Sequence, residues 1–285
     1  MKKLKMIIVA TFVLIILATS LTPGFSASDL APEPVKIPIL MYHHIAEIAN
    51  TEMVVTLDKF RSDMSYLKNA HYNAIFVEDL IAYLNGVKEL PENPIMITFD
   101  DGYTSNYTYA YPIAKELGMK MTISIIGWSM GRSFEMDGVT PIIPHFTWEE
   151  AVEMTSSGLI SLQNHTFDLH SPPGKSFAQR FKVNRGVLPL AGEHPKAYER
   201  RLTRDLMRHS IDMRERLGKQ PEIICYPYGA YTKLTEQLVK NMGFTGSFST
   251  KPGVRTYASL DDLWEMPRFN VDETTDLSTL LRNEN

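Results

Sequence analysis

The sequence has one cysteine, no excess of positive charge and no apolar run long enough for a typical membrane span. Because Cys225 is the single cysteine, no disulfide can form within the chain, which excludes the small secreted domains that disulfides hold together. The formal net charge is -4 at pH 7, with 29 Lys and Arg against 33 Asp and Glu. Proteins that bind nucleic acid normally carry a basic face, so we exclude DNA and RNA as partners.

The composition is otherwise that of an ordinary globular protein. Of the 285 residues, 44% are hydrophobic, 22% charged and 10% aromatic, which excludes a disordered, collagen-like or coiled-coil chain. This length is compatible with two domains or with one α/β barrel of roughly 250 residues. The arrangement of motifs along the chain has to decide between them.

Residues 1–27 have the layout of a signal peptide. Three lysines precede an uncharged apolar run over residues 6–18, and residues 25–27 (Phe-Ser-Ala) offer a cleavage site of small residues. A bilayer span needs about 20 residues, so we expect cleavage, with an uncleaved N-terminal membrane anchor as the alternative. Residues 28–36 resemble a linker, and residues 37–285 form the expected folded part. These features predict a secreted or cell-surface protein.

Short apolar runs alternate with longer amphipathic segments from residue 37 onward. Strands are expected at residues 37–42, 74–77, 95–99, 121–126, 159–162, 223–226, 244–248 and 263–266. Helices are expected at residues 57–69, 77–84, 107–117, 148–156, 198–217 and 232–242. Because no long linker separates the units, we expect a single domain with a distorted (β/α)7–8 barrel, with an open doubly wound sheet as the alternative.

Ionisable and polar residues follow four of the expected strands. They are His43-His44, Asp100-Asp101-Gly102, the segment 164–170 (NHTFDLH) and the segment 226–229 (YPYG). In both architectures the carboxyl ends of parallel strands carry the chemistry, so these groups are expected to share one site.

Two of these motifs together predict a metal site. Adjacent residues at a strand end point in different directions, so of Asp100 and Asp101 one can bind a metal while the other accepts a proton. His165 and His170 lie five positions apart and converge only if the loop between them is tight. With one aspartate they would form an N,N,O ligand set typical of hydrolytic divalent metals. The alternatives are a simple Asp-Asp-Gly turn and two unrelated surface histidines.

The three motifs at residues 98–102 (TFDDG), 165–170 (HTFDLH) and 226–229 (YPYG) resemble those of the carbohydrate esterase family 4 polysaccharide deacetylases, which share the NodB homology domain. The resemblance extends over about residues 37–271. It implies the NodB-type barrel, a polysaccharide substrate and a divalent metal, zinc first and cobalt or nickel as alternatives. It further implies Asp100 as the general base and Asp101, His165 and His170 as the metal ligands.

The sequence departs from the wider family in its general acid. Many members take this acid from a histidine near the C-terminal end, but the last histidine here is His209. The segment 41–45 (MYHHI) resembles the subgroup that deacetylates poly-β-1,6-N-acetylglucosamine, in which the barrel is circularly permuted and the acid comes first. The resemblance therefore implies His43 as the acid, with His44 in reserve because only one of two adjacent strand residues can face the site.

A second departure concerns the arginine that often precedes the third motif and orients the catalytic aspartate. Cys225 stands in that region, and Arg268 could replace the arginine through a bidentate ion pair with Asp100, or else be an ordinary surface residue. A backbone N–H at Tyr228 is the candidate oxyanion contact. Candidate sugar contacts, for which core packing is the alternative, are Tyr103, Trp128, Tyr226, Pro227 and Tyr228.

Together these expectations predict a secreted, metal-dependent polysaccharide N-deacetylase that acts on an N-acetylglucosamine polymer, and they favour poly-β-1,6-N-acetylglucosamine as that polymer. Alternatives are a peptidoglycan N-acetylglucosamine deacetylase, a xylan-type O-acetyl esterase and a non-catalytic carbohydrate-binding relative. The N-terminus allows association with a membrane or cell surface, and nothing implies a protein partner. The segment 171–195 is either a lid or polymer contact or a solvated insertion, and the charged helix 198–217 is expected to be a solvated face.

Overall fold

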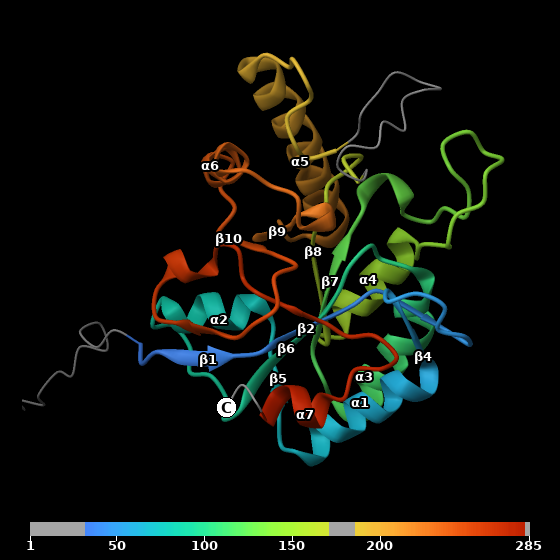
Figure 1. Ribbon diagram of the computed structural model, residues 1–285, viewed down its shortest axis with the longest axis vertical. Helices are drawn as coiled ribbons and strands as arrows, with labels where there is room; N and C mark the ends of the chain where they lie inside the picture. The colour runs from blue at the N-terminus through green and yellow to red at the C-terminus, as the bar shows by residue number, and fades with distance from the viewer. Residues whose placement is uncertain (1–31, 171–185, 283–285) are drawn as a thin grey trace, which may run out of the picture. The chain divides into compact units, whose positions relative to one another are not determined.

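A computed structural model describes residues 32–170 and 186–282 (Figure 1). These residues belong to one compact unit. The expected signal peptide, most of the expected linker and most of the segment 171–195 lie outside the described residues. Among the helices in the described ranges, none is both long enough and apolar enough to cross a bilayer.

A parallel sheet of eight strands forms the centre of the fold. Neighbouring strands follow the order β10 (Gly246–Phe248), β9 (Ile223–Cys225), β8 (Ile160–Asn164), β7 (Met121–Ile125), β6 (Pro94–Phe99), β2 (Ile39–Tyr42) and β12 (Phe269–Asn270), with β5 (Asn73–Ala74) also paired to β6. Within the described ranges β10 and β12 do not pair with each other, so the sheet curls into a half-barrel instead of closing. Two small sheets join β1 (Val35–Ile37) to β11 (Arg255–Tyr257) and β3 (His44–Ala46) to β4 (Val54–Thr56).

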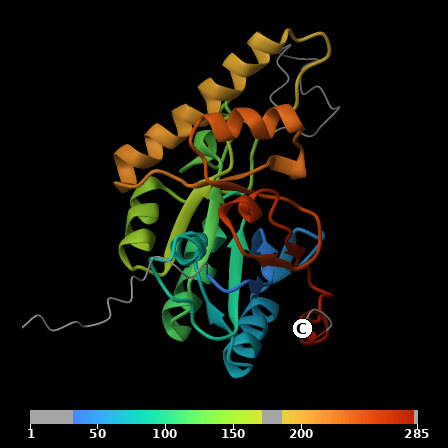
Figure 2. The same cartoon turned by 90° about the vertical axis from the view of Figure 1, so that its left-hand side faces the viewer.

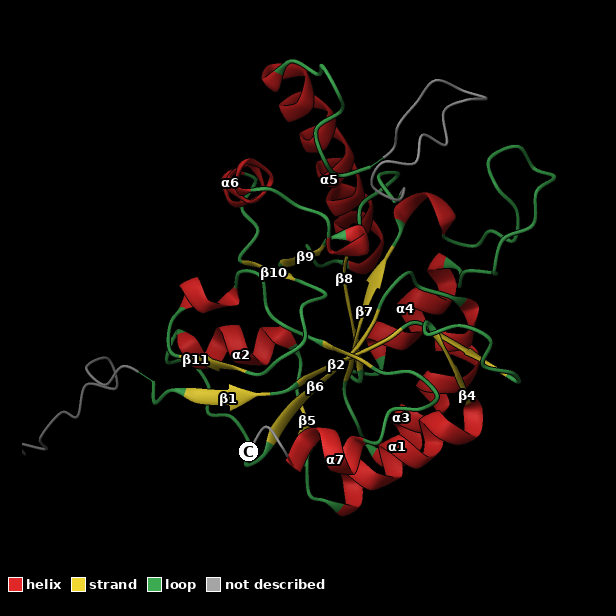
Figure 3. Cartoon of the chain, viewed as in Figure 1, coloured by secondary structure: helices red, strands yellow, loops and turns green. Residues whose placement is uncertain are grey.

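Helices cover both sides of this sheet, as the secondary-structure colours of Figure 3 show. They are α1 (Leu57–Asn69), α2 (Val77–Leu84), α3 (Tyr111–Leu117), α4 (Trp148–Ser156), α5 (Pro195–Leu217), α6 (Lys233–Asn241) and α7 (Leu277–Arg282). Figure 2 shows the long helix α5 crossing one end of the molecule beside α6. Capping residues mark the helix ends. Thr56 and Thr147 cap the N-termini of α1 and α4, and Gly218 ends α5 in the left-handed conformation.

The central strands are buried on both of their faces. Leu40 and Ile97 belong to the core beneath α1, α3 and α4, whereas Ile39 and Met96 belong to a second core that includes α2. The parallel register pairs Leu40 with Ile97 and Ile39 with Met96, which keeps each pair in one core. In β2 and β6 this burial produces nearly continuous apolar runs, whereas β7 and β8 also carry buried polar side chains.

Three expected elements differ from the structure. Residues 263–266 are not a strand, because Ser259 and Asp262 form a capping box that begins the 3-10 turn η5 (Leu260–Leu263). Only the single bridge from Phe248 to Met266 remains there, and the last strand is β12. The helix expected at 107–117 begins with a π-helical turn, η1 (Asn106–Ala110), before α3. Pro38 also divides the strand expected at residues 37–42 into β1 and β2, which belong to different sheets. The other predicted helices and strands are confirmed to within a few residues.

Candidate functional site

Four segments that follow the central strands meet in one pocket with a volume of about 490 Å³. They come after β2, β6, β8 and β9, so the carboxyl ends of parallel strands form one rim, as the sequence predicts. The lining includes His43, Asp100, Asp101, Tyr103, His165, His170 and Tyr228.

Three of these side chains form a potential metal-ligand set. Oδ1 of Asp101 lies 3.3 Å from Nε2 of His165 and 3.1 Å from Nε2 of His170. Their potential ligand atoms all lie within 4.8 Å of one another. The two histidines converge because the intervening loop is tight, with Thr166 in the left-handed region at a φ of 70°.

The environment of this set fits a divalent cation. Oδ1 of Asp101 is buried, yet within the described part of the chain it has no hydrogen-bond partner. Nδ1 of His165 lies 2.8 Å from the carbonyl oxygen of Cys225, which orients the ring so that Nε2 faces Asp101. Burial opposes the ionisation of Asp101, but His170 and His165 outweigh it and hold the pKa of this carboxyl well below its usual range. An orphaned carboxylate oxygen between two imidazole nitrogens is a suitable donor set for zinc or a similar ion.

Asp100, next in the chain, is held by a different partner. Nη1 and Nη2 of Arg268 each donate a hydrogen bond of 2.8 Å to one oxygen of its carboxylate, and Arg268 is fully buried. The Cys225 thiol donates to Oδ2 of Asp100 at 3.3 Å. Burial alone would raise the pKa of Asp100, but the guanidinium outweighs this effect and lowers it far below the ordinary carboxyl value. Arg268 is thus not a surface residue, and it forms the expected ion pair.

The two adjacent histidines separate as strand geometry requires. His43 lines the pocket, and its Nε2 lies 4.0 Å from Oδ2 of Asp100. His44 instead places Nδ1 2.9 Å from Oγ of Ser105 and is not among the residues described as lining the pocket. Burial lowers the pKa of His43. Of the two candidates for a proton donor, the structure brings His43 to the site.

The aromatic candidates divide into two groups. Tyr103 and Tyr228 line the pocket, and the Tyr228 ring, half-exposed, lies 4.8 Å from the His170 ring. A left-handed φ of 58° turns Tyr228 toward the rim.

The structure does not place the other three candidates, Tyr226, Pro227 and Trp128, among the described residues that line this pocket. Tyr226 is buried, stacks on Tyr231 and points its hydroxyl toward Glu236, and Pro227 is buried beside it. Adjacent residues of this turn face opposite sides, so only Tyr228 reaches the pocket. Trp128 lines a different pocket.

Asp205 is a site residue that sequence reasoning missed. Its Oδ1 and Oδ2 accept hydrogen bonds of 2.8 Å from the backbone N–H groups of Phe167 and Asp168, which lie between the two histidine ligands. Close packing supports the same loop, since a Cβ on Gly127 would lie only 2.6 Å from the Phe167 ring. In the sequence Asp205 is one acid among the charges of a helix, so no local signal marks it.

Comparison with known proteins agrees with this geometry. The family model for polysaccharide deacetylases matches residues 87–247. YxkH of Bacillus subtilis (strain 168), named as a candidate polysaccharide deacetylase, is 32% identical over 221 residues, covering 78% of this chain and 67% of that protein. The poly-beta-1,6-N-acetyl-D-glucosamine N-deacetylase of Staphylococcus aureus (strain N315) is 26% identical, covering 96% of this chain and 94% of its own length.

The fold also matches a solved structure, the de-N-acetylase from Aggregatibacter actinomycetemcomitans. The TM-score is 0.72 at 24% identity, with 88% of this chain and 100% of that chain covered. This similarity establishes the curled (β/α) half-barrel of the deacetylases. Together with the family match, it leads to one conclusion: the chain belongs to the polysaccharide deacetylase family and is a carbohydrate deacetylase, a hydrolase.

Proposed function

We propose that the protein is an exported, metal-dependent N-deacetylase that removes acetyl groups from N-acetylglucosamine units of an extracellular polymer, with poly-β-1,6-N-acetylglucosamine as the substrate. The observation that carries the proposal is the pocket itself. It combines the ligand set of Asp101, His165 and His170 with a separate carboxylate, Asp100, and a separate imidazole, His43. Amide hydrolysis needs both a proton acceptor and a proton donor beside the reacting carbonyl.

Asp101, His165 and His170 would hold the metal. A divalent metal such as zinc supplies Lewis acidity, which polarises a carbonyl and acidifies water. Asp100 accepts the proton of the attacking water, and Arg268 keeps its carboxylate ionised and correctly oriented. His43 protonates the leaving amine, so acetate and a glucosamine unit are the products. Tyr103 and Tyr228 line the pocket. We assign the backbone N–H of Tyr228 as the oxyanion contact and the two tyrosine rings as contacts for the sugar.

The choice of polymer rests on two features. The acid at His43 comes from the first strand of the central sheet, and the Staphylococcus aureus relative that is similar over nearly its whole length carries the name of this activity. Export rests on the charge and hydropathy pattern of residues 1–27, and an uncleaved anchor there would keep the enzyme at the cell surface.

Acetate release from defined polymers tests the proposal. The metal-reconstituted protein is incubated with β-1,6-linked N-acetylglucosamine oligomers and, in parallel, with peptidoglycan fragments and acetylated xylan, each with and without a chelator. We expect chelator-sensitive release from the β-1,6-linked oligomers. Release from peptidoglycan alone would reassign the polymer, and release from xylan alone would reassign the bond to an ester.

Two substitutions separate the assigned roles. Asp100→Asn should bind metal normally but lose turnover by about 10²-fold or more, because the base is absent. His165→Ala should lose both metal binding and turnover, because one of the three metal ligands is absent. Metal content measured by mass spectrometry alongside acetate release distinguishes them, and normal turnover in Asp100→Asn would overturn its role as base.

A further inference from the structure

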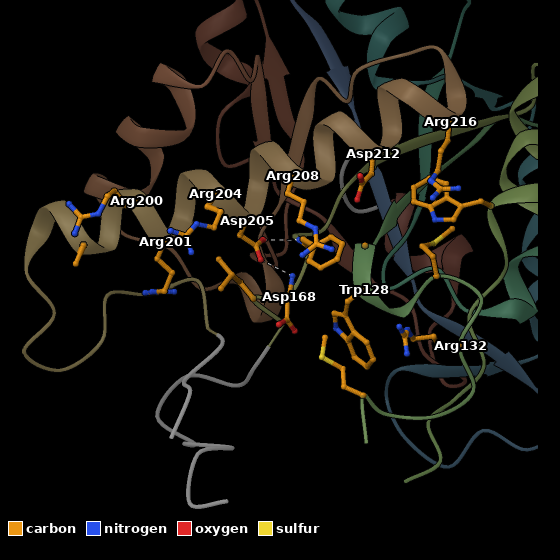
Figure 4. A pocket seen from close by; sticks show the side chains of 17 residues that line it. Trp128, Arg132, Asp168, Arg200, Arg201, Arg204, Asp205, Arg208, Asp212 and Arg216 are labelled. Carbon is orange, nitrogen blue, oxygen red and sulfur yellow. Dashed lines mark hydrogen bonds between the residues drawn. The ribbon is translucent and has the colours of Figure 1, made fainter. Parts of the chain in front are cut away.

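A second pocket, with a volume of about 840 Å³, adjoins the loop that carries the histidine ligands (Figure 4). Phe167, Asp168 and Leu169 line this pocket, whereas His165 and His170, at the two ends of the same loop, line the active-site pocket. Its lining is rich in arginine, and six arginines outnumber three aspartates there. The deacetylase chemistry uses none of these arginines.

Four of the arginines form a row along one face of α5. Arg200, Arg204, Arg208 and Arg216 are separated by multiples of four residues, and Figure 4 shows them along one side of the helix. Residues four apart lie on the same face, about 6 Å apart along the axis. Like charges four positions apart destabilise a helix, so helix stability does not explain the spacing of Arg200, Arg204 and Arg208. Asp212, four positions from both Arg208 and Arg216, has the opposite charge.

The positive charge of this row is only partly offset by the aspartates of the pocket, Asp168, Asp205 and Asp212. Within residues 32–170 and 186–282, no ion pair is formed by Arg200, Arg204, Arg208 or Arg216. Arg201, by contrast, is bound to Glu193 at 2.8 Å. Asp205 is engaged by the two backbone N–H groups of the histidine loop, so its carboxylate is already used.

Two members of the row are oriented by aromatic rings. The guanidinium of Arg208 lies 3.6 Å from the centroid of the Phe167 ring, and that of Arg216 lies 5.0 Å from the centroid of Trp148. A stacked guanidinium uses its face for the ring and keeps its in-plane N–H donors for a bidentate anion. Trp128 adds a partly exposed aromatic surface to the same pocket.

We propose that this pocket binds an anionic polymer of polyol or sugar units joined by phosphodiesters, with successive phosphates paired to the arginine row and the polyol or sugar units against Trp128. A row of cations suits a repeating charge better than a single anion. Phosphodiesters stay ionised at every physiological pH and present two oxygens to an arginine fork. The ligand differs from the deacetylation product, because glucosamine units carry amines that the arginines repel.

Binding of the full chain to poly(glycerol phosphate), measured over a series of salt concentrations, tests this assignment. The double variant Arg200→Gln/Arg204→Gln should bind at least about tenfold more weakly and with a shallower salt dependence, because charge-assisted hydrogen bonds are lost. Arg214→Gln is the matched control, since Arg214 is exposed on the same helix but is not among the described lining residues. Its affinity should stay within about twofold of the wild type.

Competing ligands show which anionic group the pocket prefers. The assay measures binding alone, so its result does not depend on deacetylase activity. Equal binding by the double variant and the wild type would overturn the proposal, as would no binding by the wild type. Tighter binding of alginate, a carboxylate polymer, would overturn the phosphodiester assignment. Binding to phosphatidylglycerol vesicles without binding to the polymer would assign the arginine row to a membrane surface instead. Thermal unfolding of each variant verifies that it is folded.

Discussion

Asp100 and Arg268 lie 168 positions apart in the sequence, yet they form a buried bidentate ion pair in which both hydrogen bonds measure 2.8 Å. Arg268 also donates from Nε to the carbonyl oxygen of Ser249, so its guanidinium cannot rotate freely. The pair fixes the plane of the carboxylate beside the ligand set. It also lowers the pKa of Asp100, which keeps the proposed base ionised.

Arg268→Lys should shift the acid limb of the pH profile. A lysine ammonium cannot form the bidentate pair, so the pKa of Asp100 should rise toward its ordinary value. Asp100 would then become protonated at a higher pH, and kcat/KM should begin to fall at a higher pH than in the wild type. We expect kcat to decrease by about 10- to 100-fold. Arg255→Lys is the control, because Arg255 donates to backbone carbonyls of Asp262 and Trp264 and is not described as lining the pocket. An unshifted acid limb in Arg268→Lys would contradict the proposed role.

His43→Gln and His44→Gln should separate the two adjacent histidines. Loss of the proton donor at His43 should reduce kcat by about 10²- to 10⁴-fold, whereas His44→Gln should retain most activity. Burial lowers the pKa of His43, so the wild-type rate should fall as the pH rises through that lowered value. The basic limb should disappear in His43→Gln. Deacetylation of short oligomers measured from pH 4 to 9 tests both statements, and similar rates for the two variants would refute the assignment.

Asp205→Asn should weaken metal binding without touching a ligand. Phe167 and Asp168 each donate to a different oxygen of Asp205, and asparagine replaces one of these oxygens with an NH2 donor, so one of the two hydrogen bonds is lost. The loop that positions His165 and His170 would loosen, and metal affinity should fall by about tenfold. Competition with a chromophoric chelator measures this directly. Asp212→Asn is the matched control, on the same helix and in the same second pocket, and equal metal affinities of the two variants would argue against the clamp.

His209 should make the fold sensitive to mild acid. It is fully buried and hydrogen-bonded to the carbonyl oxygen of Ile125, and burial lowers its pKa to about 4. The unfolded chain takes up this proton near pH 6.5, so stability is complete above that value and declines as the pH falls toward 4.

Between pH 7 and pH 5 His209 should cost on the order of 2 kcal/mol of unfolding free energy. Urea unfolding in the presence of a chelator measures the loss, and His209→Gln, which can still donate to Ile125, should reduce it. Part of the loss should persist, because burial also lowers the pKa of His145 to about 4. An identical pH dependence in the variant and the wild type would disprove the contribution of His209.

Local rules made much of the fold predictable. The helices α1, α2 and α4 begin and end where the sequence predicts, because local capping acts within a few positions. A threonine caps α1 and α4, and the Asp79 side chain of α2 accepts from the backbone N–H of Phe76. The prediction of a strand at residues 263–266 is wrong because a local capping signal also acts there. The apolar residues of this segment resemble a strand, but the Ser259–Asp262 capping box gives the chain a turn instead.

The sequence by itself determined the parallel α/β class and the acid and histidine motifs at the strand ends, since these depend on periodicity and on short spacings. Only the tertiary structure decided which of His43 and His44 faces the pocket, that Arg268 pairs with Asp100, that Tyr226 and Trp128 lie elsewhere, and that Asp205 holds the histidine loop. The physical reason is distance along the chain. The ion pair of Asp100 and the clamp on the histidine loop join residues 37 to 168 positions apart, and strand register and sheet curvature bring those residues together.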